Sequence, residues 1–153
     1  MSEVKKFRMR PRLAQLVKQS GGMYVTDALK RADAALDVMR EPLLTSIDDY
    51  LVKFDTLLAE PDAPDLIETL YRCSADVISL SGAEQTDAVQ TAARSLCDLV
   101  GEAGAVTPAL LAGIKVHVAS IKLLHRAKLD PATQAPILAG LARVLEKQRG
   151  GEG

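Results

Sequence analysis

The sequence predicts an all-α protein: an antiparallel bundle of five to six helices, preceded by a flexible basic N-terminal arm. Three observations lead to this class. Apolar residues recur at three- and four-residue steps through most of the chain, which is typical of amphipathic helices. No segment alternates apolar and polar residues with enrichment in β-branched types, so strands are not expected. Most proline and glycine residues fall between the periodic segments, where they start and stop helices.

The first 18 residues form the basic arm. They carry a charge of +5, whereas the net charge of the whole chain is −1, so the rest of the chain carries −6. The cations are Lys5, Lys6, Arg8, Arg10, Arg12 and Lys18, against a single Glu3. Pro11 suits the first turn of a short helix, and Gly21-Gly22 ends it. We therefore predict an arm with a short helix over residues 1–24, a bundle over 25–149 and a disordered tail over 150–153.

A long helix follows, with Thr26 or Asp27 as its N-cap. One apolar face is expected to point inward; its positions are Leu29, Ala32, Leu36, Met39, Leu43, Ile47, Tyr50 or Leu51, Phe54 and Leu57. Pro42 interrupts the helix, because proline lacks an N–H donor and crowds the preceding turn. The apolar stripe stays in phase across it, so both a kink and a break remain open.

Four further segments show helical periodicity. Pro61 and Pro64 bracket a linker, after which residues 65–80 and 88–100 are predicted to be helical, each stopped by glycine. Thr107-Pro108 and Asp130-Pro131 combine a capping side chain with a proline, which is a helix start signal. They predict helices over 107–125 and from 130 to about 149.

Composition excludes several classes of function. Only 3% of residues are aromatic and none is tryptophan, which argues against a base-stacking surface or a cofactor pocket; we expect no cofactor. No apolar run is long enough to cross a membrane, and no secretory signal follows Met1, so a cytoplasmic location is expected. Cys73 and Cys97 lack metal-ligand spacing and are predicted to be small buried apolar residues.

The two histidines are the first candidates for chemistry. His125 with Lys128 keeps the spacing of a phosphotransfer histidine and its lysine, but Leu129 stands where such a motif has a small residue. Histidine phosphotransfer through His125 is therefore one alternative; the simpler interpretation is a histidine stabilised at a helix C-terminus. His117 falls on the apolar stripe and is expected to be a hydrogen-bonded core residue. The two lie too far apart to share a metal, and no metal site is predicted.

No catalytic motif accompanies these residues. The pairs Asp87/Gln90 and Asp130/Gln134 have the acid–amide spacing that could orient a water, but such pairs arise by chance in polar helices. Phosphate-binding glycine motifs and nucleophile elbows are absent from the sequence. We therefore expect a non-enzymatic protein.

The arm carries the positive signal for function. Lys5, Lys6, Arg8, Arg10 and Arg12 could attract an acidic protein surface, nucleic acid or anionic lipid. An acidic protein is the best fit, because the chain as a whole has a pI of about 6.1, whereas a dedicated nucleic-acid binder usually has a basic domain. A nucleic-acid-associated factor remains a second alternative, and a merely solubilising arm a third interpretation.

The same region carries a resemblance to a known family. The run from Phe7 to Lys18, then Gly21-Gly22-Met23, then the run from Thr26 to Asp33 resembles the start of small helical CheE-type proteins, which are encoded in chemotaxis gene clusters of alphaproteobacteria. The resemblance covers about the first 40 residues. It implies an accessory, non-enzymatic partner in chemotaxis signalling and brings no catalytic residues.

The sequence thus favours a helical accessory or adaptor protein that acts through protein–protein contacts, in chemotaxis or two-component signalling. The contact would use the basic arm and an exposed stripe of the long helix. The long helix also offers surface for a second copy, so a homodimer is open.

Overall fold

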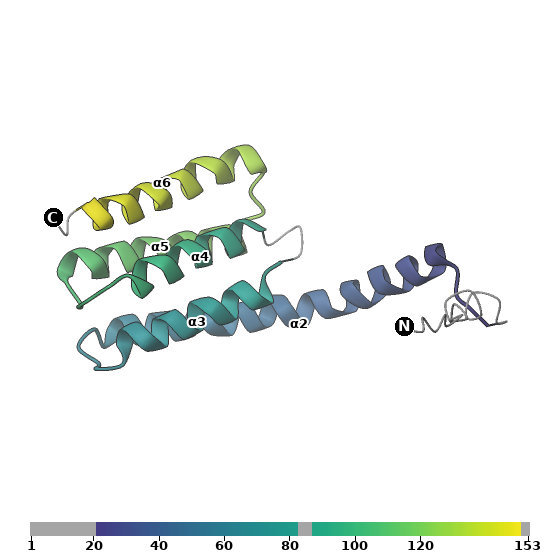
Figure 1. The fold of residues 1–153 in the computed structure, drawn as a ribbon, viewed down its shortest axis with the longest axis horizontal. Coiled ribbons are helices and arrows are strands. Elements are labelled where there is room, and N and C mark those ends of the chain that lie inside the picture. Colours follow the sequence, from purple (N-terminus) through teal and green to yellow (C-terminus); the bar gives the residue numbers. More distant parts are fainter. Residues whose placement is uncertain (1–20, 83–86, 151–153) are drawn as a thin grey trace, which may run out of the picture. The chain divides into compact units, whose positions relative to one another are not determined.

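The computed structural model describes residues 21–82 and 87–150, which form five helices and contain no strand. In chain order these are α2 (Val25–Ala59), α3 (Leu66–Leu80), α4 (Asp87–Gly101), α5 (Pro108–Arg126) and α6 (Pro131–Gly150) (Figure 1). The predicted all-α class is confirmed. The arm, the short helix expected after Pro11 and the last three residues of the predicted tail lie outside the described residues.

Capping side chains set the starts of α5 and α6, as predicted. Thr107 is extended (φ −110°, ψ 158°), and its Oγ1 accepts a hydrogen bond from the N–H of Leu110 at 3.1 Å. Asp130 Oδ1 accepts from the N–H groups of Ala132 and Thr133, at 2.9 and 3.1 Å. The hydroxyl of Thr133 donates to Asp130 Oδ2 at 2.7 Å, and this hydrogen bond is the main reason that the pKa of Asp130 lies below its usual value. These bonds satisfy N–H groups that have no partner within the helix.

Thr107→Ala is expected to lower the free energy of unfolding by about 1 kcal/mol, because the substitution leaves the N–H of Leu110 without its cap. Urea unfolding followed by circular dichroism would measure this change. Thr107→Ser retains a hydroxyl and should cost only a few tenths of that amount. Equal losses in the two variants would show that the methyl group, not the cap, is what matters.

The core lies around α4. This helix packs against α3, α5 and α6, and Figure 1 shows these helices lying alongside one another. α4 has three buried alanines, Ala88, Ala92 and Ala93. Because their side chains are small, the neighbouring helices can approach α4 closely. The larger fully buried side chains are Leu66, Leu70, Leu96, Leu99, Leu110, Ile114, Ile121 and Leu141, with Ile47, Leu51 and Phe54 of α2.

The second half of α2 joins this core. Ile47, Leu51 and Phe54 are fully buried, which confirms the inward face predicted for this part of the helix. At the edge, the hydroxyl of Tyr50 donates to Asp76 Oδ2 on α3 at 2.9 Å. This hydrogen bond is the main reason that the pKa of Tyr50 is raised.

The first half of α2 differs from the prediction. The chain divides into two units, residues 1–39 and 40–153, and the first half of α2 belongs to the first of them. Leu29, Leu36 and Met39 are 58%, 62% and 55% exposed, so the expectation that they face inward is wrong. Helical periodicity identifies which residues share a face, but burial of that face depends on which element packs against it.

Pro42 does not end α2. The structure has a single helix from Val25 to Ala59 with this proline inside it. Just beyond it, the hydroxyls of Thr45 and Ser46 donate to the carbonyl oxygens of Glu41 and Pro42, at 3.0 and 2.9 Å. Of the two outcomes that the sequence left open, a break is therefore excluded. Pro136 likewise lies inside α6 without ending it.

Candidate functional site

The partner-binding residues predicted from the sequence all belong to the basic arm. Lys5, Lys6, Arg8, Arg10 and Arg12 lie outside the described residues. The prediction that this arm binds an acidic partner therefore stays a prediction. The histidines, the acid–amide pairs and the cysteines can be placed.

His125 lies in the last turn of α5 and faces α2. Its side chain is only 5% exposed, and its Nε2 lies 3.3 Å from Oδ1 of Asp48. The other ring nitrogen, Nδ1, is buried without a hydrogen-bond partner. A phosphotransfer histidine has to present a ring nitrogen to the protein that phosphorylates it, and this burial does not favour that role. Phosphotransfer through His125 stays an untested prediction.

His117 is a satisfied core residue. It is fully buried, and its Nδ1 lies 2.8 Å from the carbonyl oxygen of Gly113. Because a carbonyl only accepts, Nδ1 carries the proton, and Nε2 accepts from the hydroxyl of Ser95 at 2.9 Å. Burial lowers the pKa of His117 below its usual value, since a charged ring would be desolvated there.

The acid–amide pairs have structural roles. The Nε2 of Gln90 donates to the carbonyl oxygens of Ile78 and Ser81, at 3.2 and 2.8 Å, and so satisfies the end of α3. The Nε2 of Gln134 donates to Leu129, beside the capping carboxylate of Asp130. Each amide is engaged with backbone rather than held over an open site.

No group of three or more histidine, cysteine, aspartate or glutamate side chains within residues 21–82 and 87–150 could hold a metal ion. Cys73 is buried and Cys97 half-buried, and both are unpaired thiols whose pKa is raised by burial. Burial disfavours the thiolate that reactive cysteines need.

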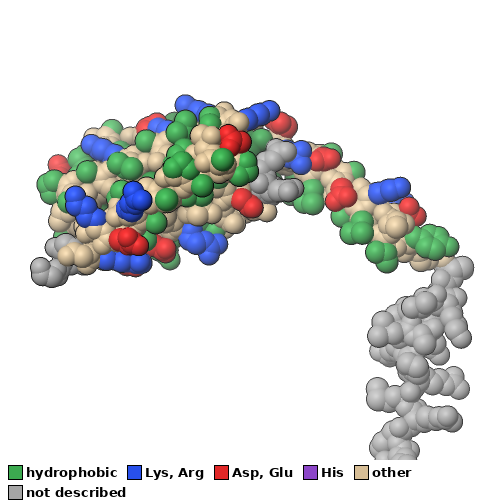
Figure 2. Space-filling view, turned by 90° about the horizontal axis from the view of Figure 1, so that it is seen from above, with side chains coloured by type: hydrophobic (Ala, Val, Ile, Leu, Met, Phe, Trp, Pro, Cys, Tyr) green, Lys and Arg blue, Asp and Glu red, His purple; other side chains and the backbone are tan. Residues whose placement is uncertain are grey.

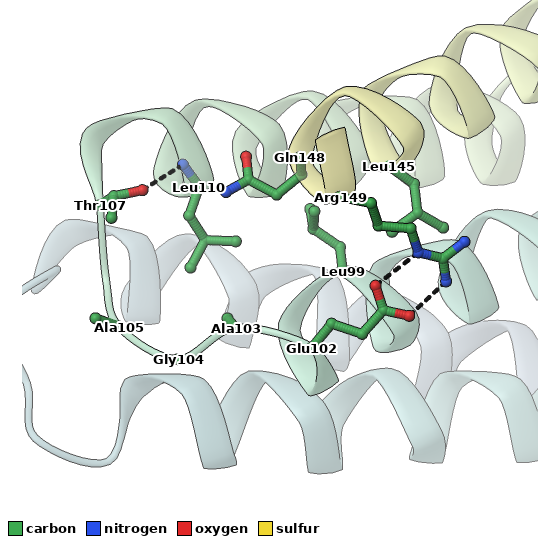
Figure 3. A pocket seen from close by; sticks show the side chains of 10 residues that line it. All are labelled: Leu99, Glu102, Ala103, Gly104, Ala105, Thr107, Leu110, Leu145, Gln148 and Arg149. Carbon is green, nitrogen blue, oxygen red and sulfur yellow. Dashed lines mark hydrogen bonds and ion pairs between the residues drawn. The ribbon is translucent and has the colours of Figure 1, made fainter. Parts of the chain in front are cut away.

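A pocket of about 280 Å³ lies between the ends of α4, α5 and α6 (Figure 3). Its apolar wall comes from Leu99, Leu110 and Leu145. Arg149 of α6 forms a bidentate ion pair with Glu102, which lies just after α4. The Nε of Arg149 is 2.7 Å from the Oε2 of Glu102, and its second contact joins Nη2 to Oε1. This contact lowers the pKa of Glu102. The pocket therefore offers an apolar recess beside an already neutralised ion pair, which suits a small apolar group.

A larger groove of about 650 Å³ runs along α5 and α6 on the other side of Thr107 and Gln148, which line both cavities. Its floor is made of small and apolar residues, among them Ala109, Ala112 and Val116 of α5 and Val144 of α6. Gly113 lies at its base, and a Cβ atom there would lie 3.3 Å from the Leu99 and Val144 side chains. Glycine thus lets α5 lie close to its neighbours.

The two helices that form the groove are rich in cations, one of which, Lys147, lines the groove. α5 contains no aspartate or glutamate, and α6 contains one, Glu146. Together they carry six cations: Lys115, Lys122, Arg126, Arg143, Lys147 and Arg149. Lys122 pairs with Asp55 and Arg149 with Glu102, whereas the other four are exposed and Lys147 lines the groove itself. From above, on the side of α6, Figure 2 shows hydrophobic side chains lying between separate Lys and Arg side chains.

Sequence reasoning missed this surface. The sequence was divided into a basic arm and a mildly acidic remainder beyond residue 18. Within that remainder, α5 and α6 were considered only for their apolar core residues. The signal was present, because a 19-residue helix without a single acidic residue stands out in a chain with 20 aspartates and glutamates.

Comparison with known proteins adds no family to this description: no family model, no curated protein and no solved structure matches the chain. None of the helices in the described part of the chain has the length and apolar character needed to cross a membrane.

Proposed function

We propose that this protein is a non-enzymatic helical adaptor that binds an acidic surface of a signalling protein, in a chemotaxis or two-component pathway. The observation that supports it is the groove of α5 and α6, which has an apolar floor and the cation Lys147 in its lining, on two helices that together carry six cations and one anion. The resemblance of residues 7–33 to CheE-type proteins supports the pathway.

An amphipathic helix with acidic flanks fits such a groove. Its apolar residues would cover Ala112, Val116 and Val144, and its carboxylates would face Arg143 and Lys147, which lie four residues apart on one side of α6. Charge complementarity of this kind speeds association and selects among partners. The basic arm would add to the same attraction, since both surfaces carry positive charge.

Affinity co-purification from the native cell tests the proposal. The full chain is compared with a chain lacking residues 1–18 and with the double variant Arg143→Glu/Lys147→Glu. We expect acidic signalling proteins to be recovered with the full chain and to fall at least about ten-fold in the double variant, a loss of roughly 1.4 kcal/mol in binding. Loss on removal of residues 1–18 would assign a share of the binding to the arm.

Arg72→Glu is the matched control, since Arg72 is an exposed cation on α3. Recovery of the same proteins in equal amounts with every variant would contradict an electrostatic docking surface. Recovery of nucleic acid that is lost steeply with added salt would instead favour the nucleic-acid alternative.

A further inference from the structure

The pocket between the ends of α4, α5 and α6 is a cavity that the proposed function does not use (Figure 3). Its volume is about 280 Å³. An apolar cavity of roughly 150 Å³ holds a single benzene ring. A molecule of two fused rings therefore matches the size of this pocket.

Three leucines from three helices form the inner wall of the pocket. Leu99 of α4 and Leu110 of α5 are each 1% exposed, and Leu145 of α6 is 9% exposed. Leucine side chains offer a ligand dispersion contacts and no hydrogen bond. The free energy of binding at this wall therefore comes from apolar ligand surface that leaves water.

The ion pair of Arg149 and Glu102 favours an aromatic and uncharged ligand. These side chains are 52% and 47% exposed, so the pair lies where the pocket meets the surface. Its two contacts hold the guanidinium plane in one orientation, and such a plane stacks well on an aromatic ring. Because the two charges already neutralise each other, a charged ligand would lose hydration without gaining a free counter-charge.

One polar side chain can orient a ligand in the pocket. Gln148 of α6 is half-buried and lines the pocket, and within the described part of the chain its amide has no hydrogen-bond partner. The amide oxygen can accept a hydrogen bond from a ligand N–H. A mostly apolar lining with a few polar groups is typical of small-molecule sites.

We propose that this pocket binds a small, uncharged aromatic molecule of two fused rings with one N–H donor, of which indole is the simplest example. The rings lie against the three leucines and stack on the guanidinium of Arg149. The ring N–H donates to the amide oxygen of Gln148. This inference does not depend on the proposed function, because it uses another cavity and another class of ligand.

The fluorescence of indole, titrated with the full chain, tests the proposal. The chain contains no tryptophan, so indole emission comes from the ligand alone. We expect the emission to shift to shorter wavelength and to saturate at one indole per chain. Indole-3-acetate and tryptamine carry the same rings with a negative or a positive charge, and each should bind less tightly than indole. Tighter binding of either one, or no saturable shift with indole, would overturn the proposal.

Three variants locate the site. Ala103→Leu enlarges a side chain of the lining and should weaken indole binding at least about ten-fold. Arg149→Lys keeps the charge but loses the planar group, and should weaken binding roughly two- to five-fold. Gln148→Met keeps the length of the side chain and removes the amide, which should also weaken binding.

Ala135→Leu and Arg72→Lys are the matched controls, since both residues are exposed and lie outside the pocket lining. They should bind indole as tightly as the unsubstituted chain. Circular dichroism checks that each variant is folded. If Ala103→Leu does not fold, the two conservative variants at Arg149 and Gln148 decide. Affinity that is unchanged in all folded pocket variants would place the indole elsewhere and overturn the proposal.

Discussion

Phe54→Ala is expected to lower the free energy of unfolding by about 3–5 kcal/mol, the range found when a buried aromatic side chain is truncated. Phe54 is fully buried and comes from the part of α2 that belongs to the same unit as the other helices. The substitution removes its apolar contacts and leaves a cavity that the surrounding leucines cannot fill without shifting. Urea denaturation followed by circular dichroism at 222 nm would measure the change.

Val52→Ala serves as the control on the same helix. Val52 is 61% exposed, and alanine favours helix slightly more than valine does, so its stability should change by less than about 0.5 kcal/mol. If Phe54→Ala unfolded as late as Val52→Ala, the second half of α2 would not be part of the core.

Acidification from pH 6.5 to pH 5 is expected to destabilise the protein through His117. Burial holds its pKa in the folded state below the value of about 6.5 that it has in the unfolded chain. The unfolded chain therefore binds more protons in this window. The stability from the neutral ring is fully present above pH 6.5 and is lost as the pH falls toward the folded-state pKa. The free energy of unfolding should fall by at most about 1.4 kcal/mol for each pH unit.

The contribution of His117 is isolated by comparing the unfolding free energies of the unsubstituted chain and His117→Gln at several pH values. The variant should be less stable at pH 7.5, because the Ser95 and Gly113 contacts are disturbed. The difference between the two proteins should then shrink as the pH falls to 5. Glu102 and Asp130 have pKa values lowered from 4.5 and 3.8, so they titrate below this window. A difference that stayed constant with pH would show that the pKa of His117 is not lowered in the folded protein.

Much of the fold could be predicted because its signals are local. Thr107 and Asp130 stand directly before prolines, and a capping oxygen acts within three residues of its own position. The inward face of α2 from Ile47 to Phe54 was likewise visible in the periodicity. The exposure of Leu29 and Leu36 was not, because periodicity is the same for a stripe that packs against the core of its own chain and one that does not.

The candidate site was less predictable for a similar reason. The groove depends on α5 and α6 lying side by side, with Gly113 allowing the close approach, and neither fact is local in the sequence. Counting the charges of each helix separately would have shown that α5 and α6 are both basic. The burial of His125 could not be foreseen, since it depends on α2 lying over the last turn of α5 near Asp48.

The shared wall between the two cavities has a thermodynamic consequence. Thr107 and Gln148 line both the 280 Å³ pocket and the 650 Å³ groove. A small molecule that enters the pocket and displaces the Gln148 side chain also reshapes the groove. By linkage, the two ligands affect each other equally. If the small molecule changes the affinity of the groove for a helix by some factor, the helix changes the affinity of the pocket for the small molecule by the same factor. Two cavities at one end of a small helical bundle can in this way act as a pair of coupled receptors.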